Sequence, residues 1–147
     1  MFKRIVVGTD GSETADQAVR QAIELARLTG AKLSIVSAYS SSSGRRAQTG
    51  AQEAPADVQY EIGPREDVNL ILDAAAADAR QQGIEVQTHP VEADPADAIL
   101  NVAEEVKADL IVVGNKGMTG ARRYLLGSVP NNVSHHASCS VIIVRTS

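Results

Sequence analysis

Five short apolar runs divide the chain at intervals, and the segments between most of them carry apolar residues at helical spacing. The runs cover residues 5–7, 33–38, 84–89, 110–113 and 141–144. Short runs of this kind, bounded by glycine or polar residues, are typical of strands. The pattern therefore predicts strands that alternate with helices along the chain.

The segments between the runs contain signals for helix starts and stops. Ser12 or Thr14 suits the cap of the first helix, and Gly30 is expected to end that helix. Asp94 and Pro95 form a cap followed by a proline at the first helical position. Two further helices are expected, over residues 64–83 and from residue 128 onward.

Alternating strands and helices imply a parallel α/β sheet, because right-handed crossovers place the helices on its faces. At 147 residues, the chain is expected to form a single domain over residues 1–147. One long loop, at about residues 40–63, has almost no apolar periodicity. It is expected to be either a mobile surface excursion or a lid over a ligand, from which Arg45 and Arg46 are able to reach an anion.

Glycines gather after the fourth apolar run, where the chain has to turn. The segment contains Gly114, Gly117, Gly127, Ser128 and Pro130. Glycine lets backbone N–H groups approach an anion without a Cβ in the way. Ser128 suits a cap and Pro130 a first turn, so a helix is expected to begin at Ser128 with its unpaired N–H groups toward Gly114. The segment therefore predicts a cradle for a phosphate group.

The spacing of these residues is neither that of the lysine-ended P-loop nor that of the GxGxxG dinucleotide loop. It resembles the nucleotide-binding signature of the universal stress protein family, in its ATP-binding branch. That signature is a glycine, two residues, a second glycine, nine residues, and a third glycine followed by serine. Two further stretches agree with the family, IVVGTDGS at residues 5–12 and ADLIVVG at residues 108–114. The likeness covers nearly the whole chain apart from about residues 40–62.

The resemblance implies a Rossmann-like fold, like that of the adenine nucleotide alpha hydrolases, with a five-stranded parallel sheet of order 3-2-1-4-5 and helices on both faces. Asp10 and Gly114 would follow two adjacent strands at a topological switch point, where ligands bind. The resemblance implies that Asp10 contacts ribose hydroxyls or helps to hold Mg²⁺ on the phosphates. The implied nucleotide contacts are Asp10, Ala38, Val113, Gly114, Gly117, Gly127, Ser128 and Val129.

Composition and charge narrow the choice of partners. Aromatic residues make up 3% of the chain, which leaves little for stacking on the bases of single-stranded nucleic acid. The net charge of −4 argues against a phosphate-backbone partner. Cys139 is the only cysteine, which suits a reducing compartment, and no apolar stretch approaches the roughly 20 residues of a membrane span. These features predict a cytoplasmic protein with no nucleic-acid or membrane partner.

The sequence favours a binding protein over an enzyme. We expect a stress-response sensor or regulator that binds an adenine nucleotide, ATP foremost, with or without Mg²⁺. A slow ATPase, a cyclic-AMP-binding protein and a structural interaction module are the alternatives. The chain lacks the P-loop lysine and a paired acid and base, so no catalytic residue is assigned. Lys116, Arg122 and Arg123 are the nearest charges in the sequence, and they are left outside the core site.

The last apolar run, which begins at Val141 and ends at Val144, would form an edge strand in the order 3-2-1-4-5. It is apolar throughout and lacks the charges or proline that usually protect such an edge. A homodimer through the last strands of two copies is therefore expected.

Overall fold

The computed structural model describes residues 1–40, 65–115 and 127–146. Strands and helices alternate as the apolar pattern predicts. The described elements are β1 (Arg4–Gly8), α1 (Glu13–Thr29), β2 (Lys32–Tyr39), α4 (Arg65–Gln81), β3 (Val86–Glu92), α5 (Pro95–Val106), β4 (Leu110–Gly114), α6 (Ser128–His136) and β5 (Ser140–Val144). The long loop expected at about residues 40–63, with Arg45 and Arg46, lies outside the described residues except for its first one.

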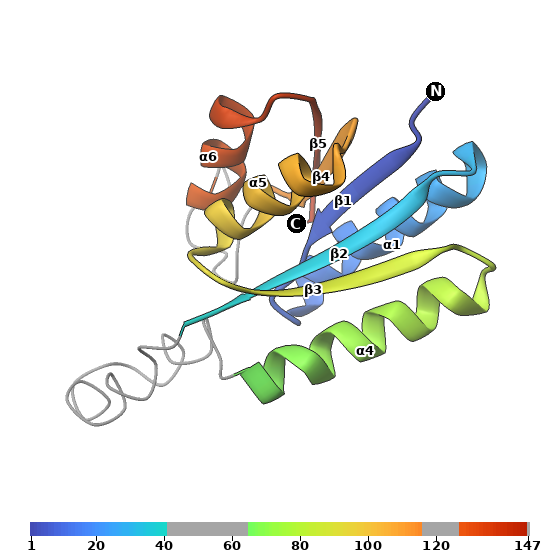
Figure 1. Ribbon diagram of the computed structural model, residues 1–147, viewed down its shortest axis with the longest axis horizontal. Coiled ribbons are helices and arrows are strands. Elements are labelled where there is room, and N and C mark those ends of the chain that lie inside the picture. Colours follow the sequence, from blue (N-terminus) through green and yellow to red (C-terminus); the bar gives the residue numbers. More distant parts are fainter. Residues whose placement is uncertain (41–64, 116–126, 147) are drawn as a thin grey trace.

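The strands form one parallel sheet of order β3-β2-β1-β4-β5 (Figure 1). This confirms the order implied by the family resemblance. β1 lies in the middle, where Ile5 is opposite Leu33 of β2 on one side and Leu110 of β4 on the other. Because every pair is parallel, the carboxyl ends of all strands meet at one edge of the sheet.

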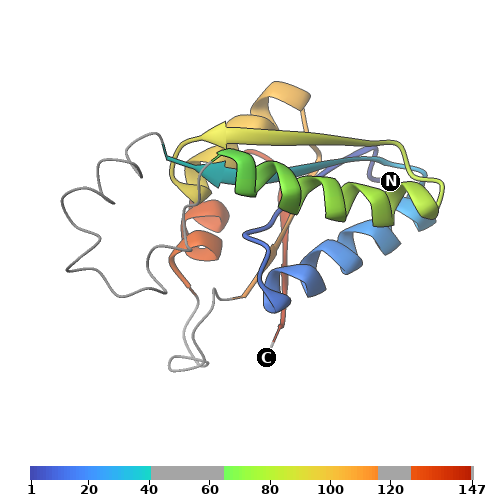
Figure 2. The same cartoon turned by 90° about the horizontal axis from the view of Figure 1, so that it is seen from below.

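Two of the described helices pack on each face of the sheet. α1 and α4 pack on one face, and α5 and α6 pack on the other (Figures 1 and 2). Successive residues of β1 point to opposite faces, so that Val7 joins the core under α1 while Val6 joins the core under α5. A strand covered on both faces needs apolar residues at every position, which explains the uninterrupted runs in the sequence.

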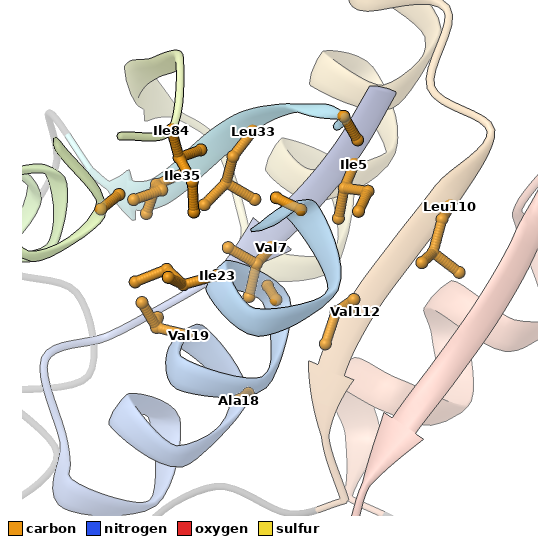
Figure 3. Packing of buried hydrophobic residues seen from close by; sticks show 14 of the residues in the cluster. Ile5, Val7, Ala18, Val19, Ile23, Leu33, Ile35, Ile84, Leu110 and Val112 are labelled. Carbon is orange, nitrogen blue, oxygen red and sulfur yellow. The ribbon is translucent and has the colours of Figure 1, made fainter. Parts of the chain in front are cut away.

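The core is aliphatic, as the shortage of aromatic residues requires. Figure 3 shows Val7, Leu33 and Val112, from three strands, in the same core cluster as Ala18 and Ile23 of α1. All five of these side chains are buried. Burying one side chain as large as valine or leucine contributes roughly 1.5–3 kcal/mol relative to leaving it in water, so the two faces supply most of the stabilisation.

Most predicted helix boundaries are confirmed. Ser12 caps α1, since its hydroxyl accepts a hydrogen bond from the backbone N–H of Ala15. Gly30 ends α1 in the left-handed conformation at φ 74°. Asp94 occupies the cap position of α5 but makes no side-chain capping hydrogen bond.

Two boundary predictions are wrong. The third strand covers Val86–Glu92 and not residues 84–89, because pairing with β2 begins at Val86 and extends through residues 90–92. Pro90 fits there since β3 is an edge strand, which does not need every N–H for pairing. The cap of α6 is Gly127, and Ser128 is the first helical residue instead of the cap.

No helix in the described parts of the chain is both long and apolar enough to cross a membrane.

Candidate functional site

The carboxyl ends of β1 and β4 lie side by side, as expected for the switch point. Val7 of β1 is opposite Val112 of β4. Two residues farther along each strand come Thr9 and Gly114. Asp10 therefore begins the turn out of the sheet beside the point where the glycine segment begins.

The turn around Asp10 is held by three short hydrogen bonds. The Thr9 N–H donates to the Val36 carbonyl of β2 at 2.9 Å, and the Gly11 N–H donates to Thr9 Oγ1 at 3.1 Å. The Ser12 N–H donates to Asp10 Oδ1 at 2.9 Å. Oδ2 of Asp10 accepts no hydrogen bond from the residues that the structure describes. One carboxylate oxygen thus shapes the turn, and the other remains available to a ligand.

Two glycines near Asp10 are explained by packing and backbone conformation. A Cβ at Gly8 would collide with the side chain of Ile99 on α5. Gly11 has φ 81°, a left-handed conformation that favours glycine, and it lies against Ile71 of α4. Neither glycine requires a ligand to account for it.

Asn115 joins the glycine segment to the start of α6. Its carbonyl accepts a hydrogen bond from the Gly127 N–H at 3.0 Å, and its own N–H donates to the Val144 carbonyl of β5 at 2.8 Å. The first of these bonds brings the two ends of the glycine segment together. Gly114 and Gly127, which are thirteen residues apart in the sequence, are thereby held close together, as the phosphate-cradle prediction requires.

The side chain of Asn115 is fixed as well. Its Oδ1 accepts hydrogen bonds from both the backbone N–H and the Oγ1 of Thr146, each at 2.8 Å. Thr146 is only 5% exposed. Sequence reasoning missed both residues, because a single asparagine and a distant threonine carry no motif or periodicity that would pair them.

The first turn of α6 presents unpaired backbone donors. The first N–H groups of any α-helix have no intrahelical acceptor. Here they belong to Ser128, which is exposed, and Val129, which is half-buried against the core. Pro130 has no N–H to offer. Among the described residues nothing accepts from these two backbone N–H groups, and the positive end of the helix dipole lies at the same terminus.

Gly127 does not need to be glycine for conformational reasons. It has φ −65° and ψ 166°, an extended conformation open to other residues. No side-chain capping bond forms at this position. Glycine is therefore not needed here for the backbone conformation. It contributes by leaving no side chain beside the N–H groups of Ser128 and Val129.

The remaining predicted nucleotide contacts lie at varying distances in the fold from Gly114 and Gly127. Ala38 is half-buried near the carboxyl end of β2, and Val113 is buried at 3% exposure in β4. Both pack on the face covered by α5 and α6. Gly117 lies outside the described residues, as do Lys116, Arg122 and Arg123. The structure thus brings together Asp10, Gly114, Gly127, Ser128 and Val129 around one edge of the sheet.

A groove of about 370 Å³ lies between α1 and α4. It reaches the turn at Thr9 and Gly11 and continues past Arg20 to Asp78. Its lining includes none of the predicted nucleotide contacts, so it is distinct from the cluster around Gly114 and Gly127.

The described groups with shifted pKa values do not form an acid–base pair at the carboxyl ends of β1 and β4. Burial lowers the pKa of His89, in the middle of β3, although the Glu105 carboxylate opposes the shift. Burial raises the pKa of the Cys139 thiol, and the nearby Asp109 carboxylate adds to this effect. Burial tends to raise the pKa of Asp109, but hydrogen bonds from the Lys3 and Arg4 N–H groups outweigh it, so this pKa is lowered. Cys139 and Asp109 precede β5 and β4, at the opposite edge of the sheet.

Residues that commonly bind metals are scattered. Within residues 1–40, 65–115 and 127–146, no three His, Cys, Asp or Glu side chains gather as a metal site. His135 and His136 are exposed in the last turn of α6.

Comparison with known proteins agrees with this geometry. A model of the universal stress protein family matches residues 1–145. Universal stress protein Rv1636 of Mycobacterium tuberculosis H37Rv is 40% identical over 146 residues, which cover 99% of this chain and 97% of the relative.

Solved structures are similar over the same length. A universal stress protein in complex with cAMP has a TM-score of 0.74 and 36% identity, and the match covers 99% of this chain and 98% of the other. The universal stress protein from Archaeoglobus fulgidus in complex with dAMP has a TM-score of 0.68 and 27% identity, covering 97% and 98%. A family match over residues 1–145, together with the sheet order and the glycine segment, shows that this chain belongs to the universal stress protein family.

Proposed function

We propose that this protein binds an adenine nucleotide, ATP foremost, at the carboxyl edge of β1 and β4. The observation that carries the proposal is the hydrogen bond from the Gly127 N–H to the Asn115 carbonyl, which holds Gly114 beside the free N–H groups of α6. Phosphate at this point would accept hydrogen bonds from Ser128 and Val129 and would meet the positive end of the helix dipole.

The identity of the base and the sugar rests on the relatives and on Asp10. The two solved relatives carry cAMP and dAMP, which share adenine. Ala38, near the end of β2, would offer backbone groups to adenine. The free Oδ2 of Asp10 would accept from ribose hydroxyls or contact Mg²⁺ bound to the phosphates. Val113, Gly117 and Ser128 complete the proposed contacts.

The role that we propose is that of a sensor or regulator in the cytoplasmic stress response, and not that of an enzyme. A cradle of backbone N–H groups stabilises phosphates equally in the ground state and in the transition state, and such uniform binding does not raise kcat. A slow ATPase would need a further group to align water, and Asp10 is the candidate among the described residues.

Calorimetry with ATP, AMP, cAMP, dAMP and GTP tests the binding proposal directly. We expect binding of the adenine nucleotides and weaker binding of GTP, and mass spectrometry of the natively purified protein should find an adenine nucleotide. Failure of every adenine nucleotide to bind would refute the proposal.

A single-turnover measurement separates the sensor from the ATPase. We expect ATP bound with Mg²⁺ to persist for many minutes. Asp10→Asn is the matched variant, because its amide oxygen can still accept from the Ser12 N–H and preserve the turn. Turnover at about 1 per second, the lower end of typical kcat values, that disappears in Asp10→Asn would instead make Asp10 catalytic.

We further propose a homodimer through β5. This strand is at the edge of the sheet, and Ile143 on it is 36% exposed, one of the few large apolar side chains that reach the surface of the described parts. A second copy that covers this edge would remove apolar surface from water and occupy the free strand edge.

A further inference from the structure

Three segments that are distant in sequence meet at Asn115. Its N–H donates to Val144 at the end of β5, and its carbonyl accepts from Gly127 at the start of α6. Its Oδ1 accepts twice from Thr146, the second residue after β5. The N–H, the carbonyl and the Oδ1 of Asn115 thus each form a hydrogen bond to another segment.

The hydrogen bonds between Thr146 and the Asn115 side chain are costly to break. Thr146 is buried, and a buried hydroxyl or N–H without a partner is costly. Both donors of Thr146 rely on the same oxygen, at 2.8 Å each. The backbone N–H can only donate, so this pairing also fixes which end of the Asn115 amide faces Thr146. Asn115 can shift only if Thr146 shifts with it or loses its partner.

The backbone carbonyl of Asn115 then transmits this constraint. It holds the N–H of Gly127, the residue that caps α6. The N–H groups of Ser128 and Val129 follow immediately. A displacement of Asn115 therefore changes the position of these donors relative to Gly114.

We propose that Asn115 and Thr146 are positioning residues, through which the segment after β5 sets the geometry of the phosphate cradle and so the affinity for the phosphates of the nucleotide. The inference rests on the proposed nucleotide binding and adds a residue, Thr146, that need not touch the ligand. Because linkage is reciprocal, bound nucleotide will in turn hold the segment after β5 more firmly.

The test removes one donor without changing shape. Thr146→Val loses Oγ1 but keeps the backbone N–H, whereas Thr146→Ser keeps both donors. Thr29→Val is a matched control, because Thr29 Oγ1 also makes one hydrogen bond, to the Leu25 carbonyl at 2.7 Å, at the far end of α1. Affinities for ATP and for adenosine, which lacks phosphate, are measured by calorimetry. Hydrogen exchange of the Gly127 amide is measured without ligand.

Thr146→Val should weaken ATP binding about five-fold, the effect of one lost hydrogen bond, and leave adenosine binding unchanged. Its Gly127 amide should exchange faster than in the wild type. Thr146→Ser and Thr29→Val should match the wild type in both measurements.

Equal losses for ATP and adenosine would reduce Thr146 to a purely structural role and overturn the proposal. Unchanged ATP affinity in a folded Thr146→Val would overturn it as well. If the wild type binds no adenine nucleotide, the proposed function fails, and the positioning of the cradle by Thr146 is then decided by the Gly127 exchange rate alone.

Discussion

Gly127→Val tests whether the start of α6 is a phosphate site. The backbone at Gly127, with φ −65° and ψ 166°, is open to valine, so the variant should fold. Replacing a glycine cap by a residue that is unfavourable there should cost about 1 kcal/mol of folding stability at most. A small change in Tm is therefore expected, and thermal denaturation measures it.

The expected loss of binding is much larger. The N–H groups of Ser128 and Val129 have no acceptor among the described residues, and Pro130 adds no third donor because it has no N–H. A hydrogen bond to a charged group contributes about 1.5–3 kcal/mol, so a branched side chain that keeps phosphate away from both donors should cost at least ~3 kcal/mol. That corresponds to a roughly hundred-fold higher Kd for ATP. Adenosine, which has no phosphate, should bind as before.

Calorimetry with ATP and adenosine measures both ligands on the same preparation. Asn132→Val, on the exposed surface of α6, is the control for introducing valine into this helix. A folded Gly127→Val that binds ATP with the wild-type Kd would refute the cradle, since the structure leaves no conformational reason for glycine at this position.

Three further predictions concern packing, pH and assembly. Gly8→Ala should lower the free energy of unfolding by about 1–3 kcal/mol in urea titrations, because its Cβ meets the side chain of the buried Ile99. Adding Ile99→Val removes Cδ1, so the double variant should recover part of this loss. His89 has a pKa below its ordinary 6.5, and its Nε2 is buried with no hydrogen-bond partner in the described parts of the chain. The unfolded chain therefore takes up a proton more readily, and the free energy of unfolding should fall as the pH drops below about 6.5. His89→Leu should show a smaller loss of stability between pH 8 and pH 5 than the wild type, and an equal loss would contradict this account. Ile143→Lys should convert a dimer to a monomer in sedimentation at micromolar concentration, and a wild type that is already monomeric would argue against the β5 interface.

The fold was predictable because each local signal agreed with the next. Continuous apolar runs such as residues 110–113 require cover on both faces, and the helical segments between the runs indicate that helices supply it. Ser12 and Gly30 marked the ends of α1 through chemistry that acts within one turn. The strand order came from the family resemblance, since periodicity cannot say which strands are neighbours.

The errors fell where local signals are ambiguous. The third apolar run ends at His89, but the strand continues through Pro90, because an edge strand tolerates the missing donor. Gly127 and Ser128 both suit a helix start, and the structure places the cap one residue earlier than the serine indicated. Boundary errors of this size arise because adjacent residues compete for the same role.

The site was predictable only as far as its residues form a motif. Gly114, Gly127 and Ser128 stand at a recognisable spacing, whereas Asn115 and Thr146 are 31 residues apart and share no pattern. Their hydrogen bonds exist because β4 and β5 are parallel neighbours, so the residues that leave the two strands emerge together. A motif thus names the groups that face a ligand, while the residues that hold those groups in place follow from strand register and become visible only in three dimensions.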